Sequence, residues 1–158
     1  PVMSDDQSTV ETIEAFLADD KATMAGRMLG PLLEREFQEI AEQFKVLMPY
    51  NRRNEYTLAP LVERVRLRVR EKLGGGHEVY GAIKKLEEGA GFRNFCAHWK
   101  NPSSQFSREE IREVLDGWYW VELLVRCNRE TGCGRVAQYD GSSGRFECKC
   151  GTKLLSKA

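Results

Sequence analysis

Four cysteines lie within the last 32 residues of the chain, at Cys127, Cys133, Cys148 and Cys150, and they restrict how this end can fold. They form a C-x5-C pair and a C-x-C pair separated by fourteen residues. Between the pairs, residues 136–139 and 145–147 resemble short strands on either side of a glycine- and serine-rich turn, which predicts a β-hairpin. A hairpin this small buries too little apolar surface to be stable alone, so we expect a covalent or metal cross-link.

Two kinds of cross-link fit this spacing, namely a tetrahedral zinc ion or a pair of disulfides. Zinc bound by four thiolates supplies folding free energy to a small module. Gly134 and Gly151 each follow a cysteine, where a metal-binding turn needs room for backbone N–H groups near sulfur. We favour zinc because the sequence shows no secretory signal and because disulfides would leave Cys96 unpaired. Residues 127–155 are therefore interpreted as a zinc-ribbon-like, four-cysteine module with Zn²⁺ in a structural role.

The composition is that of an ordinary globular protein, with 41% hydrophobic and 30% charged residues and a net charge of zero. Zero net charge argues against a broad nucleic-acid-coating surface. Residues 126–158 nevertheless contain seven Lys/Arg and three Asp/Glu, a net charge of +4, which suggests a polyanionic partner for this end. No apolar run approaches the roughly 18 residues of a membrane span, so we expect a cytoplasmic protein that does not associate with membranes.

Apolar residues repeat at helical spacing through most of the remaining sequence. The pattern in residues 64–70 also alternates as a strand would, but the longer pattern around it favours a helix. Short connections between amphipathic helices predict a mainly α fold, a four- or five-helix bundle over residues 8–126. The expected helices run from a cap at Ser8 or Thr9 to Leu17, from Gly30-Pro31 to Pro49, over roughly 57–73, from about Val79 to a stop at Gly89 and Gly91, and from a capping box at Ser107 and Glu110 to Val125.

The segment from Gly91 to Lys100 holds the main candidate for chemistry, Arg93, Asn94 and His98. Histidine titrates near neutral pH and can move protons, while the planar arginine guanidinium can stabilise charge on a phosphate. These groups suit cleavage of RNA by its own 2′-OH, which requires no metal. Residues five apart on a regular helix point about 140° away from each other, so we expect Arg93 and His98 to need a helix end or an irregular turn to converge. The alternative is a buried histidine beside a surface arginine.

A helical bundle with Arg-Asn-x3-His shortly before its last long helix resembles the HEPN superfamily of ribonucleases and toxins. The resemblance covers about residues 8–126, and Arg93, Asn94 and His98 match the family's motif in order and spacing. It implies metal-independent endoribonuclease activity with these three as catalytic residues, and a homodimer in which both copies of the motif line one cleft. Residues 92–102, the last helix and the cysteine tail are also similar to C-terminal regions of large ATPases in bacterial defence and anticodon-nuclease systems.

That second similarity implies an effector of antiphage defence or a toxin, with tRNA or mRNA as substrate and a defence-system ATPase or an antitoxin as partner. The sequence contains no phosphate-binding loop, so any such ATPase is a missing part of the chain or a separate protein. Some HEPN proteins have lost catalysis, and the zinc module is not general in the family. The alternative function is therefore a non-catalytic module that binds nucleic acid through its zinc ribbon or regulates a partner ATPase.

Overall fold

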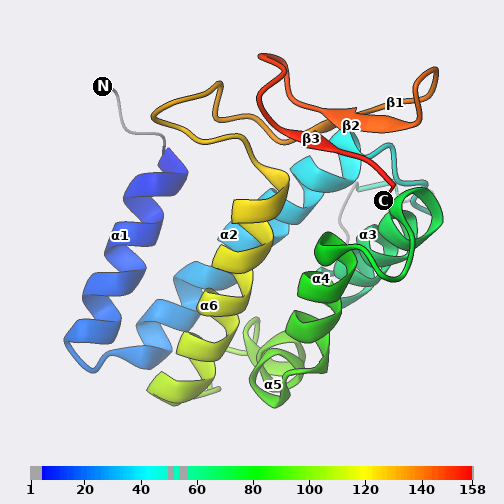
Figure 1. Ribbon diagram of the computed structural model, residues 1–158. Coiled ribbons are helices and arrows are strands. Elements are labelled where there is room, and N and C mark those ends of the chain that lie inside the picture. The colour runs from blue at the N-terminus through cyan, green and yellow to red at the C-terminus, as the bar shows by residue number, and fades with distance from the viewer. Residues whose placement is uncertain (1–4, 50–51, 54–56, 158) are drawn as a thin grey trace.

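The computed structural model describes residues 5–49, 52–53 and 57–157, and the chain there forms six helices and three short strands (Figure 1). The mainly α fold with a small C-terminal β element is thereby confirmed, with one helix and one strand more than expected. The helices are α1 (Asp5–Ala18), α2 (Ala22–Gln43), α3 (Leu58–Leu73), α4 (Glu78–Glu88), α5 (Ala90–His98) and α6 (Arg108–Val125), and the strands are β1 (Gln138–Asp140), β2 (Arg145–Glu147) and β3 (Leu154–Leu155).

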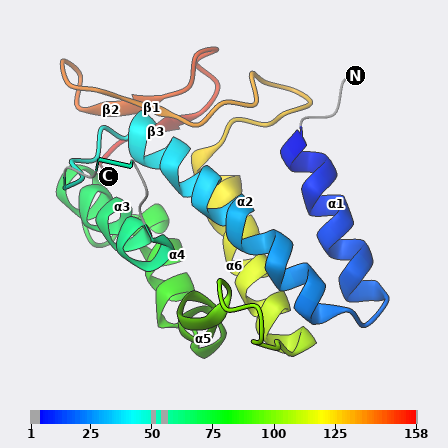
Figure 2. The same cartoon turned by 180° about the vertical axis from the view of Figure 1, so that it is seen from behind.

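Different secondary-structure elements lie at the two ends of the bundle. In the views from front and back, α5 lies at one end and the three-stranded sheet crosses the other (Figures 1 and 2). The long helices α2 and α6 run between these ends, and α1 packs against α2. The centre is filled by aromatic and aliphatic side chains, among them Phe37 and Trp118, whose ring centroids are 5.4 Å apart.

The second helix begins earlier than expected and runs through its proline. The prediction that Gly30-Pro31 opens this helix was wrong, because α2 starts at Ala22 and carries Pro31 inside it. A proline in a helix interior costs about 3 kcal/mol. Here its ring faces solvent, while buried residues before and after it, such as Leu29 and Leu33, continue one apolar face across it. Burial of that face offsets the lost hydrogen bond.

The ends of the first two helices also differ from expectation. Ser8 and Thr9 lie inside α1, where the Ser8 carbonyl accepts a hydrogen bond from the Thr12 hydroxyl, and they do not cap it. The second helix ends at Gln43, well before Pro49, since Lys45 has a φ of +52°. Local residues thus end the helix before the proline is reached.

Later helices follow the sequence pattern more closely. The stretch over residues 57–73 is helical, and the capping box of α6 is formed in both directions between Ser107 and Glu110. His77, to which the sequence assigned no role, caps α4 by accepting a hydrogen bond from the Val79 amide. Gly91 does not end α4 but lies within α5.

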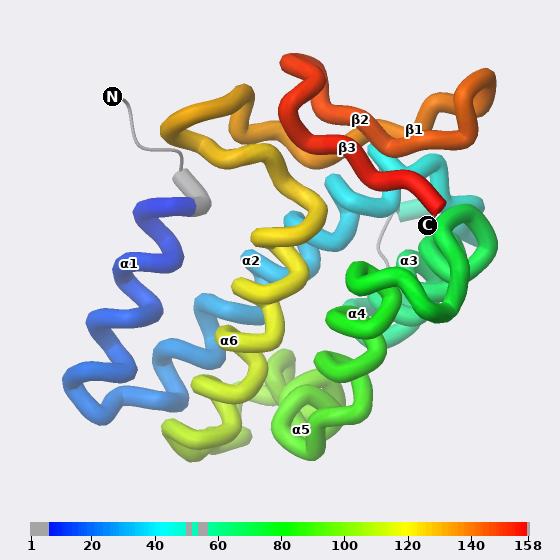
Figure 3. Tube along the Cα trace, in the orientation of Figure 1, coloured from blue at the N-terminus to red at the C-terminus, as the bar shows by residue number. Residues whose placement is uncertain are grey.

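The C-terminal residues form an antiparallel sheet in the order β1-β2-β3. Figure 3 traces the chain from the end of α6 toward α1 and back before it enters the hairpin. Phe146 pairs with Tyr139 on one side and Leu155 on the other, and its ring packs 4.5 Å from that of Phe44 at the end of α2. The second strand is therefore covered by the helical core and by a third strand that the sequence pattern did not reveal.

Arg126, between α6 and the first cysteine, joins the sheet to the bundle. Its guanidinium is buried and donates to the carboxylates of Glu36 and Glu39 and to the carbonyl of Gly134. Removal of Arg126 would leave the buried carboxylate of Glu36 without a compensating charge, so this group ties the start of the cysteine segment to α2.

Gly30 allows α2 to lie close to Trp99, the residue that follows α5. A Cβ at Gly30 would overlap the Trp99 indole, whereas a Cβ at Gly81 on α4 would meet nothing within 4 Å. We expect Gly30→Ala to destabilise the protein by about 1–3 kcal/mol through overpacking. Gly81→Ala should instead raise stability by about 0.5–1 kcal/mol through helix propensity. Urea unfolding of both variants measures the difference, and equal stabilities would contradict the close contact.

Candidate functional site

The residues Arg93, Asn94 and His98 lie on α5, a regular nine-residue helix that we call the motif helix. Aromatic side chains anchor this helix to the bundle. Phe92 and Phe95 are buried. The Phe95 ring lies 5.5 Å from Phe106 and 6.3 Å from Trp99, measured between centroids. These contacts hold one side of α5 against the bundle and leave the other side to solvent.

Arg93, Asn94 and His98 all lie on the solvent-facing half of α5. Arg93 and His98 are exposed and Asn94 is half-buried. At about 100° per residue, Arg93 and His98 stand about 140° apart, with the small side chain of Ala97 and the half-buried Asn94 between them. No irregular turn is present, contrary to one expectation, although His98 is the last residue of the helix. The two long side chains thus flank a low surface open to a ligand, and the histidine is not buried.

The three motif side chains differ in how they are held. The Asn94 amide nitrogen donates to Oε1 of Glu110 on α6, at 2.8 Å. Within the part of the chain that the structure describes, the side chains of Arg93 and His98 form no hydrogen bond or ion pair. The nearby Lys100 is paired with Glu34, at 3.2 Å. Arg93 therefore offers an uncompensated positive charge on this face.

The contact of Asn94 with Glu110 was not foreseen. The sequence gives the capping role of Glu110 through its spacing from Ser107, but nothing in it shows which helix lies across from the cap. Only the packing of α5 on α6 brings the two residues together.

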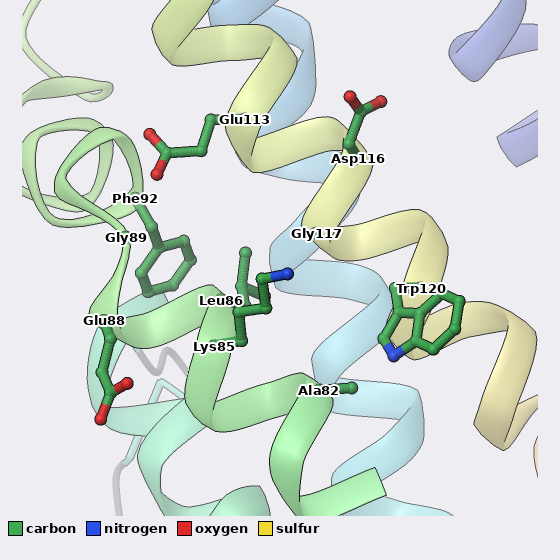
Figure 4. A pocket seen from close by; sticks show the side chains of 10 residues that line it. All are labelled: Ala82, Lys85, Leu86, Glu88, Gly89, Phe92, Glu113, Asp116, Gly117 and Trp120. Atoms are coloured by element: carbon green, nitrogen blue, oxygen red, sulfur yellow. The ribbon is translucent and has the colours of Figure 1, made fainter. Parts of the chain in front are cut away.

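A groove of about 640 Å³ adjoins the motif helix between α4 and α6 (Figure 4). Phe92 of α5 and Leu86 of α4 form part of its wall, and Trp120 of α6, which is 54% exposed, stands at its side. Its carboxylates are engaged within the chain: Glu113 accepts from the Gly91 amide, and the others pair with neighbours on their own helices. The groove therefore presents mainly an apolar wall and one large ring to solvent.

The four cysteines of the C-terminal module come together as their spacing predicted. The Sγ atoms of Cys127, Cys133, Cys148 and Cys150 all lie within 4.8 Å of one another. The Sγ of Cys150 is 3.6 Å from that of Cys127 and 3.5 Å from that of Cys148. Sulfurs around a tetrahedral zinc with Zn–S bonds of about 2.3 Å are separated by about 3.8 Å. The cluster fits one structural metal ion such as zinc, and all four thiols are free of disulfides.

The surroundings of these thiols shift their pKa values in opposite directions. The hydroxyl and backbone N–H of Thr152 hold the pKa of Cys150 at about 5, and the backbone N–H of Arg135 lowers that of Cys133. Burial raises the pKa of Cys127 to about 11, so binding of a cation there must displace a proton. Cys96 lies on α5, outside the cluster, where burial raises the pKa of its thiol to about 12.

In the described residues, no helix has the length and apolar character that crossing a membrane requires. Comparison of the chain with protein-family models, with curated proteins and with solved structures finds no match.

Proposed function

We propose that this protein is a metal-independent endoribonuclease of the HEPN type, with Arg93, Asn94 and His98 as its catalytic residues. The observation that carries the proposal is the solvent-facing half of α5, where Arg93 and His98 flank a low surface and have no partner among the described residues. Other exposed arginines, such as Arg64 and Arg108, also have no partner among the described residues, so what distinguishes Arg93 is that Asn94 and His98 lie on the same half of its helix.

The reaction joins the 2′-oxygen of a nucleotide to phosphorus and breaks the bond from phosphorus to the 5′-oxygen of the next one. His98 takes the proton of the 2′-OH as a general base. Arg93 stabilises the negative charge that builds on the phosphate oxygens. The products are a 2′,3′-cyclic phosphate and a 5′-OH.

The same chemistry supports a homodimer. In-line displacement places the attacking and leaving oxygens on opposite sides of phosphorus, so one group must remove a proton and another must supply one. Each chain places one histidine, His98, on the solvent-facing half of α5. Two copies of α5 across one cleft would provide both a base and an acid, together with two arginines.

The substrate that we propose is tRNA or mRNA, and the setting is bacterial antiphage defence or a toxin system, with an ATPase or antitoxin as the controlling partner. The four-cysteine module would bind one zinc ion as a structural brace. It lies at the far end of the bundle from α5, and no step of the cleavage passes through the metal (Figure 1).

The proposal is tested with a short RNA of mixed sequence and the same RNA carrying 2′-O-methyl groups. The full chain is incubated without added divalent metal, with EDTA low enough to leave bound zinc in place, as checked by mass spectrometry. We expect cleavage of the unmodified RNA, with cyclic phosphate ends detected by mass, and none of the methylated RNA. Cleavage of both would contradict attack by the 2′-OH. Salt-dependent binding without any product would instead support the non-catalytic module.

A further inference from the structure

One of the hydrogen bonds that tie α5 to α6 is made by the side chain of Asn94. The Asn94 amide nitrogen lies 2.8 Å from Oε1 of Glu110, and both side chains are partly buried. The second carboxylate oxygen of Glu110, Oε2, accepts from the backbone N–H of Ser107 at 2.9 Å. Each oxygen of this carboxylate is therefore occupied by one donor.

This arrangement fixes which end of the amide faces outward. An ionised carboxylate can only accept hydrogen bonds, so the side of Asn94 that faces Glu110 must be its NH2 group. Glu110 is unable to rotate freely, because it is held by the cap and lies in the first turn of α6, where the helix dipole favours a negative charge. The carbonyl oxygen, Oδ1, is then directed away from α6.

His98 is the neighbour of Asn94 on the next turn of the helix. Residues four apart on a helix have Cβ atoms about 6 Å apart and share a face. A fixed acceptor beside an imidazole selects the ring nitrogen that carries the proton and orients the ring. An Asn94 carbonyl held outward can accept an N–H of His98 and leave the other ring nitrogen for the substrate.

We propose that Glu110 is the positioning residue of this site: it holds the Asn94 amide so that Oδ1 faces His98. This inference rests on the proposed ribonuclease function for its catalytic meaning. Its structural content, the hydrogen bond between Glu110 and Asn94 and its expected effect on the His98 ring, can be tested without any substrate.

Four variants separate the positioning role from the capping role. Glu110→Gln replaces a pure acceptor with an amide, and Asn94→Asp places two carboxylates against each other. The double variant exchanges donor and acceptor, because the glutamine NH2 can donate to the aspartate and restore the bridge. Ser107→Ala removes the other half of the capping box and leaves the contact of Glu110 with Asn94 in place, so it is the matched control.

The first readout is the imidazole ¹⁵N spectrum of His98 in the full chain, which reports the tautomer. His77 is the only other histidine and caps α4, so it serves as an internal reference. We expect the His98 signals to change in both single variants and to return toward wild type in the double variant, with Ser107→Ala and the His77 signals unchanged. Wild-type His98 signals in both single variants, or equal changes in Ser107→Ala, would overturn the proposal.

The second readout is cleavage of RNA. Loss of a group that orients a histidine is expected to lower kcat by about 10–100-fold, by analogy with the partners of metal-bound histidines, with KM little changed. The double variant should recover most of that loss, and a double variant no better than the single ones would overturn the proposal. If wild type does not cleave RNA, the ribonuclease assignment fails, while the spectra still decide whether Glu110 positions Asn94 and His98.

Discussion

Cleavage of RNA is expected to fall by about 10²–10⁴-fold when His98 is replaced by alanine, the range that a general acid–base group contributes. The expected loss lies in kcat, because the imidazole moves protons in the transition state and adds little to binding of the substrate. His98 is exposed and makes no side-chain contact that stabilises the described structure, so the variant should unfold at the same urea concentration as wild type.

The matched control is His77→Ala. It removes the cap of α4 and should cost about 0.5–2 kcal/mol of stability while leaving the rate of cleavage unchanged. Arg93→Lys completes the set, since it keeps the positive charge and loses the planar fork, and its rate should fall between wild type and Arg93→Ala. If His98→Ala cleaves as fast as wild type, His98 is not catalytic and the assignment fails.

Cys148→Ser is expected to abolish zinc binding and to unfold the C-terminal module. Structural zinc has an apparent binding free energy of about 10–16 kcal/mol in zinc-finger peptides at neutral pH, far more than three short strands can replace. The helical bundle has its own core, so most of the helical circular dichroism should remain. Limited proteolysis should then cut within residues 127–157, and native mass spectrometry should show one zinc per wild-type chain.

Cys96→Ser is the control for this experiment. It removes a half-buried thiol outside the cluster and should leave one zinc per chain. Acidification should act in the same direction as Cys148→Ser, because protons compete with the metal for thiolates and zinc affinity falls as the pH falls. A wild-type chain without metal, or a Cys148→Ser chain with unchanged zinc content, would contradict a four-thiolate site.

The sequence predicted those parts of the structure that depend on local patterns. The capping box at Ser107 and the helix over residues 57–73 depend on spacing over a few residues, and the grouping of the cysteines follows from the need of so small a module for a cross-link. The start of α2 was predicted wrongly, because a local signal, Gly30-Pro31, was outweighed by burial of a continuous apolar face. Tertiary packing overrides propensity in this way wherever a long helix crosses the core.

The candidate site was predictable in its residue types but not in its geometry. The spacing of Arg93 and His98 identified them, yet their place on one exposed half of a regular helix depends on Phe92 and Phe95 facing the core. The hydrogen bond of Asn94 joins residues sixteen positions apart on different helices. The third strand contributes only two residues, too few for an alternating pattern to be recognised.

The position of the cysteine cluster beyond the far end of α6 has an electrostatic consequence. Four thiolates around Zn²⁺ carry a net charge of −2, which would repel a nucleic-acid backbone at close range. Asn94 contacts Glu110, and the fifteen residue steps of α6 from Glu110 to Val125 span about 22 Å. That is nearly three Debye lengths at physiological ionic strength, each about 8 Å. The field of a zinc complex there would be largely screened before it reached α5, so a phosphate bound at α5 would respond mainly to Arg93.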